Sequence, residues 1–194
     1  MKLLSDILYK TRLDEIVGST NVAISSVTFD SRQVKKDSLF IATKGTAVDG
    51  HNFIDKAIES GAAAVVCEEL PADQKENITY VKVLNSSEAL GYIACNYYDN
   101  PSEKLKLVGI TGTNGKTTTV TLLFNLFRGL GYNVGLLSTV ENKINNTVIP
   151  STHTTPDALK LNELLATMVE QGCQYAFMEV SSHAVVQHRI EGLK

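Results

Sequence analysis

One run rich in glycine and threonine constrains the fold of this chain more than any other: Gly109-Ile110-Thr111-Gly112-Thr113-Asn114-Gly115-Lys116-Thr117-Thr118-Thr119. It follows a short apolar segment, Leu105 to Val108, that predicts a buried strand, and it precedes a helical pattern from Lys116 to Leu130. This layout is typical of a phosphate-binding loop. Loop amides and the positive end of the helix dipole face an anion, the lysine neutralises charge, and a hydroxyl is placed for Mg²⁺. The run therefore predicts binding of a nucleoside triphosphate.

The loop departs from the general phosphate-loop pattern in one respect. Ile110 stands where the first glycine of that pattern belongs, and the glycines lie at 109 and 112. The alternative interpretation is a Gly/Thr-rich turn between a strand and a helix that binds nothing. A simple glycine turn rarely also places Lys-Thr-Thr-Thr at the start of a helix, so we favour the phosphate loop.

Strands and helices alternate after residue 105. The helix ends at Gly131, a strand follows at Val134 to Leu137, Pro156-Asp157 begins another helix, and Tyr175 to Val180 is a further strand. Such alternation predicts a parallel sheet whose ligands bind at the carboxyl ends of the strands. Both the phosphate loop and Glu179 fall at such ends. We count only three strands and therefore expect a truncated nucleotide-binding sheet.

The first hundred residues predict a small α/β unit. Its expected strands are 22–29, 38–42, 62–67 and 79–84, and its expected helices are 51–60 and 86–98, the second capped by serine. The turn Asp99-Asn100-Pro101-Ser102 then interrupts the pattern. We therefore predict an α/β protein of two domains, 1–100 and 101–194, the second a truncated parallel-sheet domain of the phosphate-loop type.

Composition excludes several classes of function. The chain has 194 residues, a net charge of −3 and no basic cluster, so we expect no nucleic-acid binding. No apolar run approaches the length of a membrane span, and residues 1–6 lack the apolar core of a signal peptide, so we expect no membrane contact and a cytoplasmic protein. We also expect a monomer. Cys67, Cys95 and Cys173 have no metal-type spacing, which predicts buried free thiols.

Polar residues after the predicted strands are the remaining candidates for a site. Glu179 ends an apolar strand and could hold Mg²⁺ opposite Thr117; by itself it could also be a glutamate that faces solvent. His183 and His188, five residues apart, are a weak zinc signal, and we interpret them as polar lining of a cleft. The segment 153–157 predicts a capped helix start that can also offer hydroxyls and amides to an anion.

Together these segments resemble the Mur ligases of peptidoglycan synthesis over the whole chain. Thr-Phe-Asp-Ser-Arg at 28–32 and Asp-Gly-His-Asn-Phe at 49–53 are similar to that family's N-terminal uridine-binding domain. The run 111–119 is similar to its phosphate loop, which accounts for the unusual glycine spacing. Glu-Val-Ser-Ser-His at 179–183 with Val-Gln-His-Arg at 186–189 resembles the subfamily that adds the third amino acid to UDP-N-acetylmuramoyl-L-alanyl-D-glutamate.

The resemblance implies a role for each matching residue. Contacts to the UDP part would come from Phe29, Ser31, Thr46, Ala47 and Val48. The phosphates of ATP would be held by Gly112, Thr113, Asn114, Gly115, Lys116, Thr117 and Thr118, with Lys116 also catalytic. Mg²⁺ would lie between Thr117 and Glu179. The muramoyl-dipeptide would be held by His153, where the family often has Asn, and by Thr154, Thr155, Ser181, Gln187 and Arg189.

The resemblance also implies a reaction. A substrate carboxylate attacks the γ-phosphate of ATP, and an amine then displaces phosphate from the acyl phosphate to form an amide, with charge stabilised electrostatically. The C-terminal domain that selects the amine, diaminopimelate or lysine, is expected outside this chain, so we expect the chain to be inactive alone. The alternatives are another Mur-type or folylpolyglutamate-type ligase, and a nucleotide-binding module without catalysis.

Overall fold

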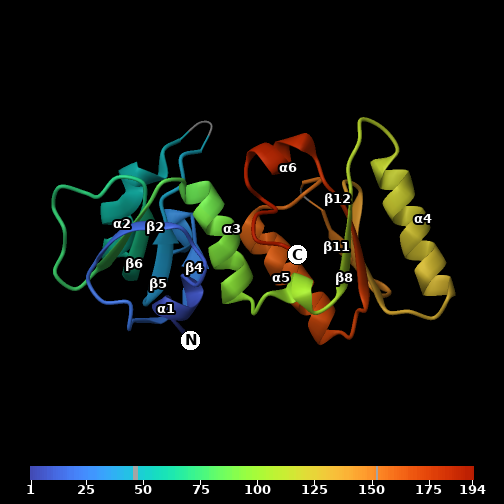
Figure 1. The fold of residues 1–194 in the computed structure, drawn as a ribbon, viewed down its shortest axis with the longest axis horizontal. Helices are drawn as coiled ribbons and strands as arrows, with labels where there is room; N and C mark the ends of the chain where they lie inside the picture. Colours follow the sequence, from blue (N-terminus) through green and yellow to red (C-terminus); the bar gives the residue numbers. More distant parts are fainter. Residues whose placement is uncertain (46–47, 152) are drawn as a thin grey trace. The chain divides into compact units, whose positions relative to one another are not determined.

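The chain folds into two compact units, Met1–Tyr97 and Tyr98–Lys194, each with its own sheet and its own core (Figure 1). The structure is a computed structural model that describes residues 1–45, 48–151 and 153–194. Within these ranges no helix has the length and apolar character needed to cross a membrane. Both units combine helices with a mixed sheet, as the α/β prediction requires.

The first unit is built on a five-stranded sheet in the order β2-β7-β6-β5-β4. Its strands are β2 (Leu13–Val17), β4 (Ser26–Thr28), β5 (Ser38–Ile41), β6 (Ala62–Cys67) and β7 (Thr79–Val83). Around it lie β1 (Lys2–Leu3), α1 (Leu4–Ile7), β3 (Ala23–Ile24), η1 (Ser31–Gln33), η2 (Gly50–Phe53), α2 (Ile54–Glu59) and α3 (Ser86–Tyr97). Strands β4 to β7 are parallel and β2 is antiparallel to β7. The central strands β5 and β6 are almost entirely buried, which explains their continuous apolar sequences.

Three sequence predictions for this unit need correction. The segment expected as one strand at 22–29 is two, β3 and β4, which belong to different sheets. Strand β2 was not predicted. The cap of α3 is Asn85, whose Oδ1 accepts from the amides of Ser87 and Glu88 at 3.0 Å. The hydroxyl of Ser86 instead donates to Glu68, so the predicted serine cap is wrong.

The second unit has a five-stranded sheet in the order β11-β10-β9-β12-β8. Its elements are η3 (Pro101–Glu103), β8 (Lys106–Ile110), α4 (Lys116–Gly129), β9 (Val134–Leu137), β10 (Glu141–Ile144), β11 (Thr147–Pro150), α5 (Ala158–Glu170), β12 (Tyr175–Glu179) and α6 (Ser182–Val186). Strands β8, β12 and β9 are parallel, as predicted, but β10 and β11 add an antiparallel hairpin. The prediction of only three strands is therefore wrong.

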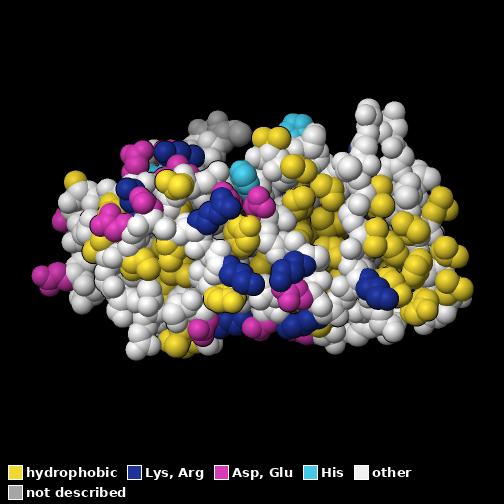
Figure 2. Space-filling model, viewed as in Figure 1, with side chains coloured by type: hydrophobic (Ala, Val, Ile, Leu, Met, Phe, Trp, Pro, Cys, Tyr) yellow, Lys and Arg dark blue, Asp and Glu magenta, His cyan; other side chains and the backbone are white. Residues whose placement is uncertain are grey.

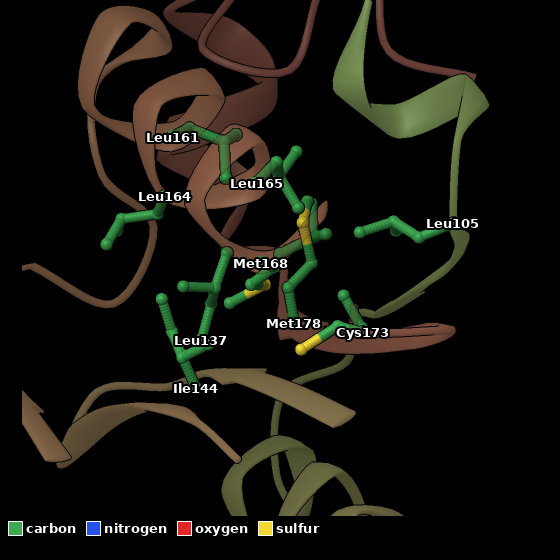
Figure 3. Close-up of a cluster of buried hydrophobic side chains, with 11 residues drawn as sticks. Leu105, Leu137, Ile144, Leu161, Leu164, Leu165, Met168, Cys173 and Met178 are labelled. Atoms are coloured by element: carbon green, nitrogen blue, oxygen red, sulfur yellow. The ribbon is translucent and has the colours of Figure 1, made fainter. Parts of the chain in front are cut away.

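Helices α4 and α5 cover opposite faces of this sheet (Figure 1). Because side chains alternate along a strand, Leu136 packs under α4 while its neighbour Leu137 packs under α5. The core beneath α5 contains Leu161, Leu165 and Met168, which point toward the sheet (Figure 3). This two-sided burial holds β9 and β12, whereas β8, at the edge of the sheet, is half-buried to exposed along its length, so the prediction of a buried strand there is wrong.

The outer face of α4 is unusually apolar. Leu122, Leu126 and Leu130 recur every four residues and are 64%, 57% and 64% exposed. Figure 2 shows hydrophobic side chains gathered over this helix. A surface helix normally presents polar residues on the face away from the core. The leucine row is therefore a surface feature of this unit that its own core does not explain.

Candidate functional site

The predicted phosphate loop joins β8 to α4. It begins after Ile110, and α4 begins at Lys116 with Gly115 as its N-cap. Gly112 and Gly115 have φ values of +143° and +82°, which side-chain-bearing residues rarely adopt. Gly115 carries no side chain to cap the helix, so the amides of the first turn keep their hydrogen-bonding capacity for an anion. Asn114 and Thr118 lie in this same loop and first turn.

Lys116 lies against the loop that precedes it. Its Nζ donates to the carbonyl oxygen of Gly112 at 2.7 Å. Lys116 and Thr117 both line a cleft of about 600 Å³ in the second unit. The cleft is lined by Thr111, Gly112, Thr113, Lys116, Thr117, Thr139, Thr154, Glu179, Ser181, Ser182 and His183. The phosphate loop and the segment after β12 are therefore brought together, as the sequence predicted for neighbouring strand ends.

Strand register explains why Glu179 reaches this cleft. Strand β12 pairs with β8 in parallel, and Glu179 is the partner of Ile110, the last residue before the loop. The Glu179 residue is only 1% exposed, although it lines the cleft. A buried carboxylate needs hydrogen-bond donors. Thr139 supplies two: its amide donates to Oε1 at 2.8 Å and its hydroxyl donates to Oε2 at 3.2 Å.

Thr139 is a site residue that sequence reasoning missed. It follows β9, the third parallel strand, so its place after a strand end was a usable signal. It lies with Thr154 across a 3.1 Å contact between their hydroxyl oxygens. The carboxyl ends of β8, β9 and β12 thus all contribute to one cleft, as expected for a parallel sheet.

The predicted muramoyl-dipeptide residues occupy different positions. Thr154 and Ser181 line the cleft. Thr155 is buried, and its hydroxyl donates to the carbonyl of Glu179 at 2.8 Å and accepts from the amide of Ser181 at 3.2 Å. Both capacities of that hydroxyl are used within the protein, which favours a bracing role for Thr155. Ser181 also caps α6 by accepting from the amide of Ala184.

Arg189, Gln187 and His153 do not belong to the lining of this cleft. The Arg189 guanidinium donates to the carbonyl of Thr155 at 2.6 Å and twice to the Gln187 side-chain oxygen, at 2.9 and 2.6 Å. Arg189 therefore joins the segment after α6 to the segment before α5. His153 is exposed, and its carbonyl accepts from the hydroxyl of Ser151. A direct substrate contact from these three residues stays a prediction.

The oxygen donors in this cleft fit a magnesium–nucleotide complex. Thr117 offers a hydroxyl and Glu179 a carboxylate, both hard ligands. In the described part of the chain, no three His, Cys, Asp or Glu side chains cluster as a metal cage. Mg²⁺ usually takes one or two protein oxygens and completes its shell with phosphate and water. The donor set therefore suits a cation that arrives with a phosphate group.

The first unit contains a second cleft, of about 640 Å³. It is lined by Phe29, Asp30, Ser31, Arg32, Phe40, Thr43, Gly45, Val48, Gly50, Phe53 and Lys56. Three of the predicted uridine contacts, Phe29, Ser31 and Val48, thus share one cavity, while Thr46 and Ala47 lie outside the described residues. Phe29 is 38% exposed, so it is accessible to a ligand in this cleft. Hydrogen bonds from Arg32 lower the pKa of Asp30, which caps η1.

The loop that carries Val48 is fastened by a histidine. His51 Nδ1 lies 2.6 Å from Asp49 Oδ1, and His51 Nε2 accepts from the amide of Glu68 at 2.9 Å. An amide must donate, so Nε2 is unprotonated and Nδ1 carries the hydrogen. The backbone amide and the side chain of His51 lower the pKa of Asp49. Lys44 also pairs with Glu68 at 3.0 Å. The loop base is therefore held to the end of β6.

Family models match both units. The model described as "Mur ligase middle domain" matches residues 110–194, and the one described as "Mur ligase family, catalytic domain" matches residues 23–98. A UDP-N-acetylmuramoyl-L-alanyl-D-glutamate--2,6-diaminopimelate ligase of Cytophaga hutchinsonii is 59% identical over 98% of this chain. The enzyme of that name from Bacteroides fragilis is 52% identical over 98%. The chain spans 40% and 39% of the length of these relatives.

Two solved structures share the fold of this chain. A diaminopimelate ligase of the same name superposes with a TM-score of 0.78 over 98% of this chain and 38% of its own; at 24% identity it supports the fold alone. The MurF ligase from Thermotoga maritima in complex with ADP is 27% identical, with a TM-score of 0.54 over 81% of this chain and 32% of its own. From the family matches, the relatives and the shared fold, the chain belongs to the Mur ligase family.

Proposed function

We propose that a protein carrying this chain is an ATP-dependent ligase that joins diaminopimelate to UDP-N-acetylmuramoyl-L-alanyl-D-glutamate. The observation that carries the proposal is the cleft of the second unit, which collects the phosphate loop, Lys116, Thr117 and Glu179 at neighbouring strand ends. The choice of substrates rests on the names of the relatives.

The residues of the cleft have distinct roles in this proposal. The amides of the loop and of the first turn of α4 bind the phosphates of ATP, and Lys116 neutralises the charge that shifts during phosphoryl transfer. Thr117 and Glu179 hold Mg²⁺, which supplies further charge stabilisation when bound. Thr154 and Ser181 lie on the same cleft and bind the muramoyl-dipeptide beside the nucleotide. Most of the catalysis in such a site comes from positioning and electrostatics.

The reaction proceeds in two balanced steps. A carboxylate oxygen of the UDP-linked dipeptide forms a bond to the γ-phosphorus of ATP, and the bond to the leaving ADP breaks. The amine nitrogen of the incoming amino acid then forms a bond to the acyl carbon, phosphate leaves, and the nitrogen releases a proton. The chain's own contribution is to hold the phosphates, the carboxylate and the charge of the transferring group in one place.

The cleft of the first unit holds the uridine part in this proposal. Phe29 offers an exposed ring face to the base, and Ser31 and Val48 lie on the same cavity. Thr46 and Ala47, which flank Val48 in sequence, stay predicted contacts. Lys56, also on the lining, provides positive charge for the diphosphate.

Nucleotide binding is tested first on the 194-residue chain. Titration calorimetry with Mg·ADP should give a measurable affinity in the wild type. Lys116→Ala should weaken it by about tenfold to a hundredfold, because a charge-assisted contact to phosphate is lost. Lys160→Ala is the matched control, since Lys160 pairs with Glu163 on the surface of α5. Equal affinity in all three proteins would remove the phosphate loop from the proposal.

Ligation is tested in a chimaera in which these residues replace the matching part of the Cytophaga hutchinsonii relative. Phosphate release should depend on both the UDP-dipeptide and diaminopimelate, and Lys116→Ala should lower turnover at saturating ATP roughly a hundredfold. Nucleotide binding without ligation in a folded chimaera would favour a binding module. Ligation of a different acid substrate would favour another ligase of the superfamily.

A further inference from the structure

We propose that Thr139 is a positioning residue: it orients the Glu179 carboxylate so that this group can receive the metal of a metal–nucleotide complex. The inference rests on the proposed function, because it concerns the same cleft. Thr139 does not itself have to touch the nucleotide. Its effect would pass through Glu179, to which it donates twice.

The geometry of the pair is specific. One residue donates to both carboxylate oxygens, from its backbone amide to Oε1 and from its hydroxyl to Oε2. Two donors from one residue fix the plane of the carboxylate as well as its position. Each carboxylate oxygen has two lone-pair sites, so one remains on each after these bonds. Glu179 lines the cleft, and these sites are where a cation can bind.

Thr139 is itself held rigidly by the turn around it. The neighbouring Ser138 amide donates to Asn142 Oδ1 at 3.3 Å, and the Ser138 hydroxyl donates to the carbonyl of Glu141 at 2.7 Å. The hydroxyl of Ser151 donates to the carbonyl of Ser138 at 2.8 Å. The donors of Thr139 are therefore set in place by contacts that do not involve Glu179, which is what preorganisation of a metal ligand requires.

Thr139 also lies between the two proposed parts of the cleft, the part that binds the metal–nucleotide complex and the part that binds the muramoyl-dipeptide. Its hydroxyl oxygen lies 3.2 Å from Glu179 Oε2 and 3.1 Å from the Thr154 hydroxyl oxygen, and its single hydrogen can be donated to either acceptor. A chain of hydroxyl groups thus runs from the carboxylate to a residue proposed to bind the muramoyl-dipeptide. Occupancy of one half can influence the orientation of groups in the other.

The test uses substitutions that separate the hydroxyl from the shape of the side chain. Thr139→Ser keeps the hydroxyl, and Thr139→Val keeps the shape and the amide but removes the hydroxyl. Thr147→Val is the control, because Thr147 is an exposed threonine at the start of β11 on the hairpin that follows. Mn²⁺ binding to the 194-residue chain saturated with ADP is measured by electron paramagnetic resonance. Affinity for ADP without metal is measured in parallel.

We expect Thr139→Val to weaken Mn²⁺ binding by about tenfold, within the range for loss of a group that supports a metal ligand. Thr139→Ser should stay within about twofold of the wild type, and Thr147→Val should not differ. Metal-free ADP affinity should be unchanged in all variants. A folded Thr139→Val protein with wild-type Mn²⁺ affinity would overturn the inference. Failure of the wild type to bind Mn²⁺ with ADP would instead contradict the proposed function.

A double substitution distinguishes an effect that passes through Glu179 from a purely structural effect of Thr139. In a Glu179→Gln background the metal ligand is already impaired, so adding Thr139→Val should weaken Mn²⁺ binding by less than about twofold further. A bracing role that weakens the whole cleft without acting through Glu179 predicts the same fractional loss of Mn²⁺ affinity in both backgrounds, together with a lower melting temperature. If Thr139→Val fails to fold, Thr139→Ala provides the same comparison, and a wild-type affinity for Mn²⁺ in that variant rejects the inference.

Discussion

At the scale of single residues, the two glycines that flank α4 provide a matched comparison. Gly115 precedes the helix with φ +82° and Gly131 follows it with φ +90°, and a Cβ added at either would meet no atom within 4 Å. Alanine at each position should therefore cost a similar backbone strain, roughly 1–2 kcal/mol of the free energy of unfolding. Only Gly115→Ala should also weaken Mg·ADP binding, because Gly115 belongs to the phosphate loop.

Urea unfolding and calorimetric titration of the two variants measure both quantities. The comparison is informative because the conformational penalty is shared and the position differs. If Gly131→Ala lost as much affinity for Mg·ADP as Gly115→Ala, the loss would follow from general strain on α4. The proposed role of the loop amides would then lose its support.

The sequence predicted the positions of residues that lie at strand ends. Lys116, Thr117 and Glu179 could be placed in one cleft because parallel strands end at the same edge of a sheet. Thr139 follows a predicted strand end, which was a usable signal, but only the structure shows its two hydrogen bonds to Glu179. The sequence predicted a substrate contact for Thr155, but only the structure reveals that its hydroxyl both donates and accepts a hydrogen bond within the protein.

At the scale of elements, the close approach of α5 to β9 depends on a missing side chain. A Cβ added to Gly135 would overlap Sδ of Met168, a fully buried residue on the sheet-facing side of α5 (Figure 3). Gly135→Ala should therefore destabilise the chain by about 1–3 kcal/mol through overpacking. Met168→Ala alone should cost about 2–5 kcal/mol by leaving a cavity.

The double variant Gly135→Ala, Met168→Ala should be less destabilised than the sum of the two, by about 1 kcal/mol or more, because the added methyl enters the space that the methionine leaves. Urea unfolding of the four proteins gives this coupling energy. Strict additivity would mean that helix and strand do not compete for the same space. The presence of glycine at position 135 would then need an explanation other than this contact.

Elements were predictable where their pattern was simple. The buried parallel strands read as apolar runs, and the helices carry apolar residues at helical spacing. The hairpin β10–β11 was missed because Asn142, on an inward position of β10, is polar yet buried, where it accepts from the amide of Ser138. The turn signal was present in Asn145-Asn146, with Asn145 at φ +54°. Local polarity concealed a strand that tertiary contacts make favourable.

At the scale of the whole molecule, each unit has its own core and its own candidate ligand cleft. Differential scanning calorimetry can therefore assign ligands to units. A ligand at a hundred times its dissociation constant stabilises the unit that binds it by about 2.7 kcal/mol. UDP should raise the melting temperature of the first unit, and Mg·ADP that of the second.

The variant Lys116→Ala tests whether the shift in melting temperature caused by Mg·ADP depends on the predicted phosphate loop. The substitution should abolish most of the shift caused by Mg·ADP and leave the shift caused by UDP intact, because the two clefts are lined by separate sets of residues. Ser31→Ala should show the converse pattern, since Ser31 lines only the cleft of the first unit. If one cooperative transition responds to either ligand, the units are energetically coupled. If Lys116→Ala removes the shift in melting temperature caused by UDP, uridine does not bind in the first unit, and the assignment of one ligand to each unit is wrong.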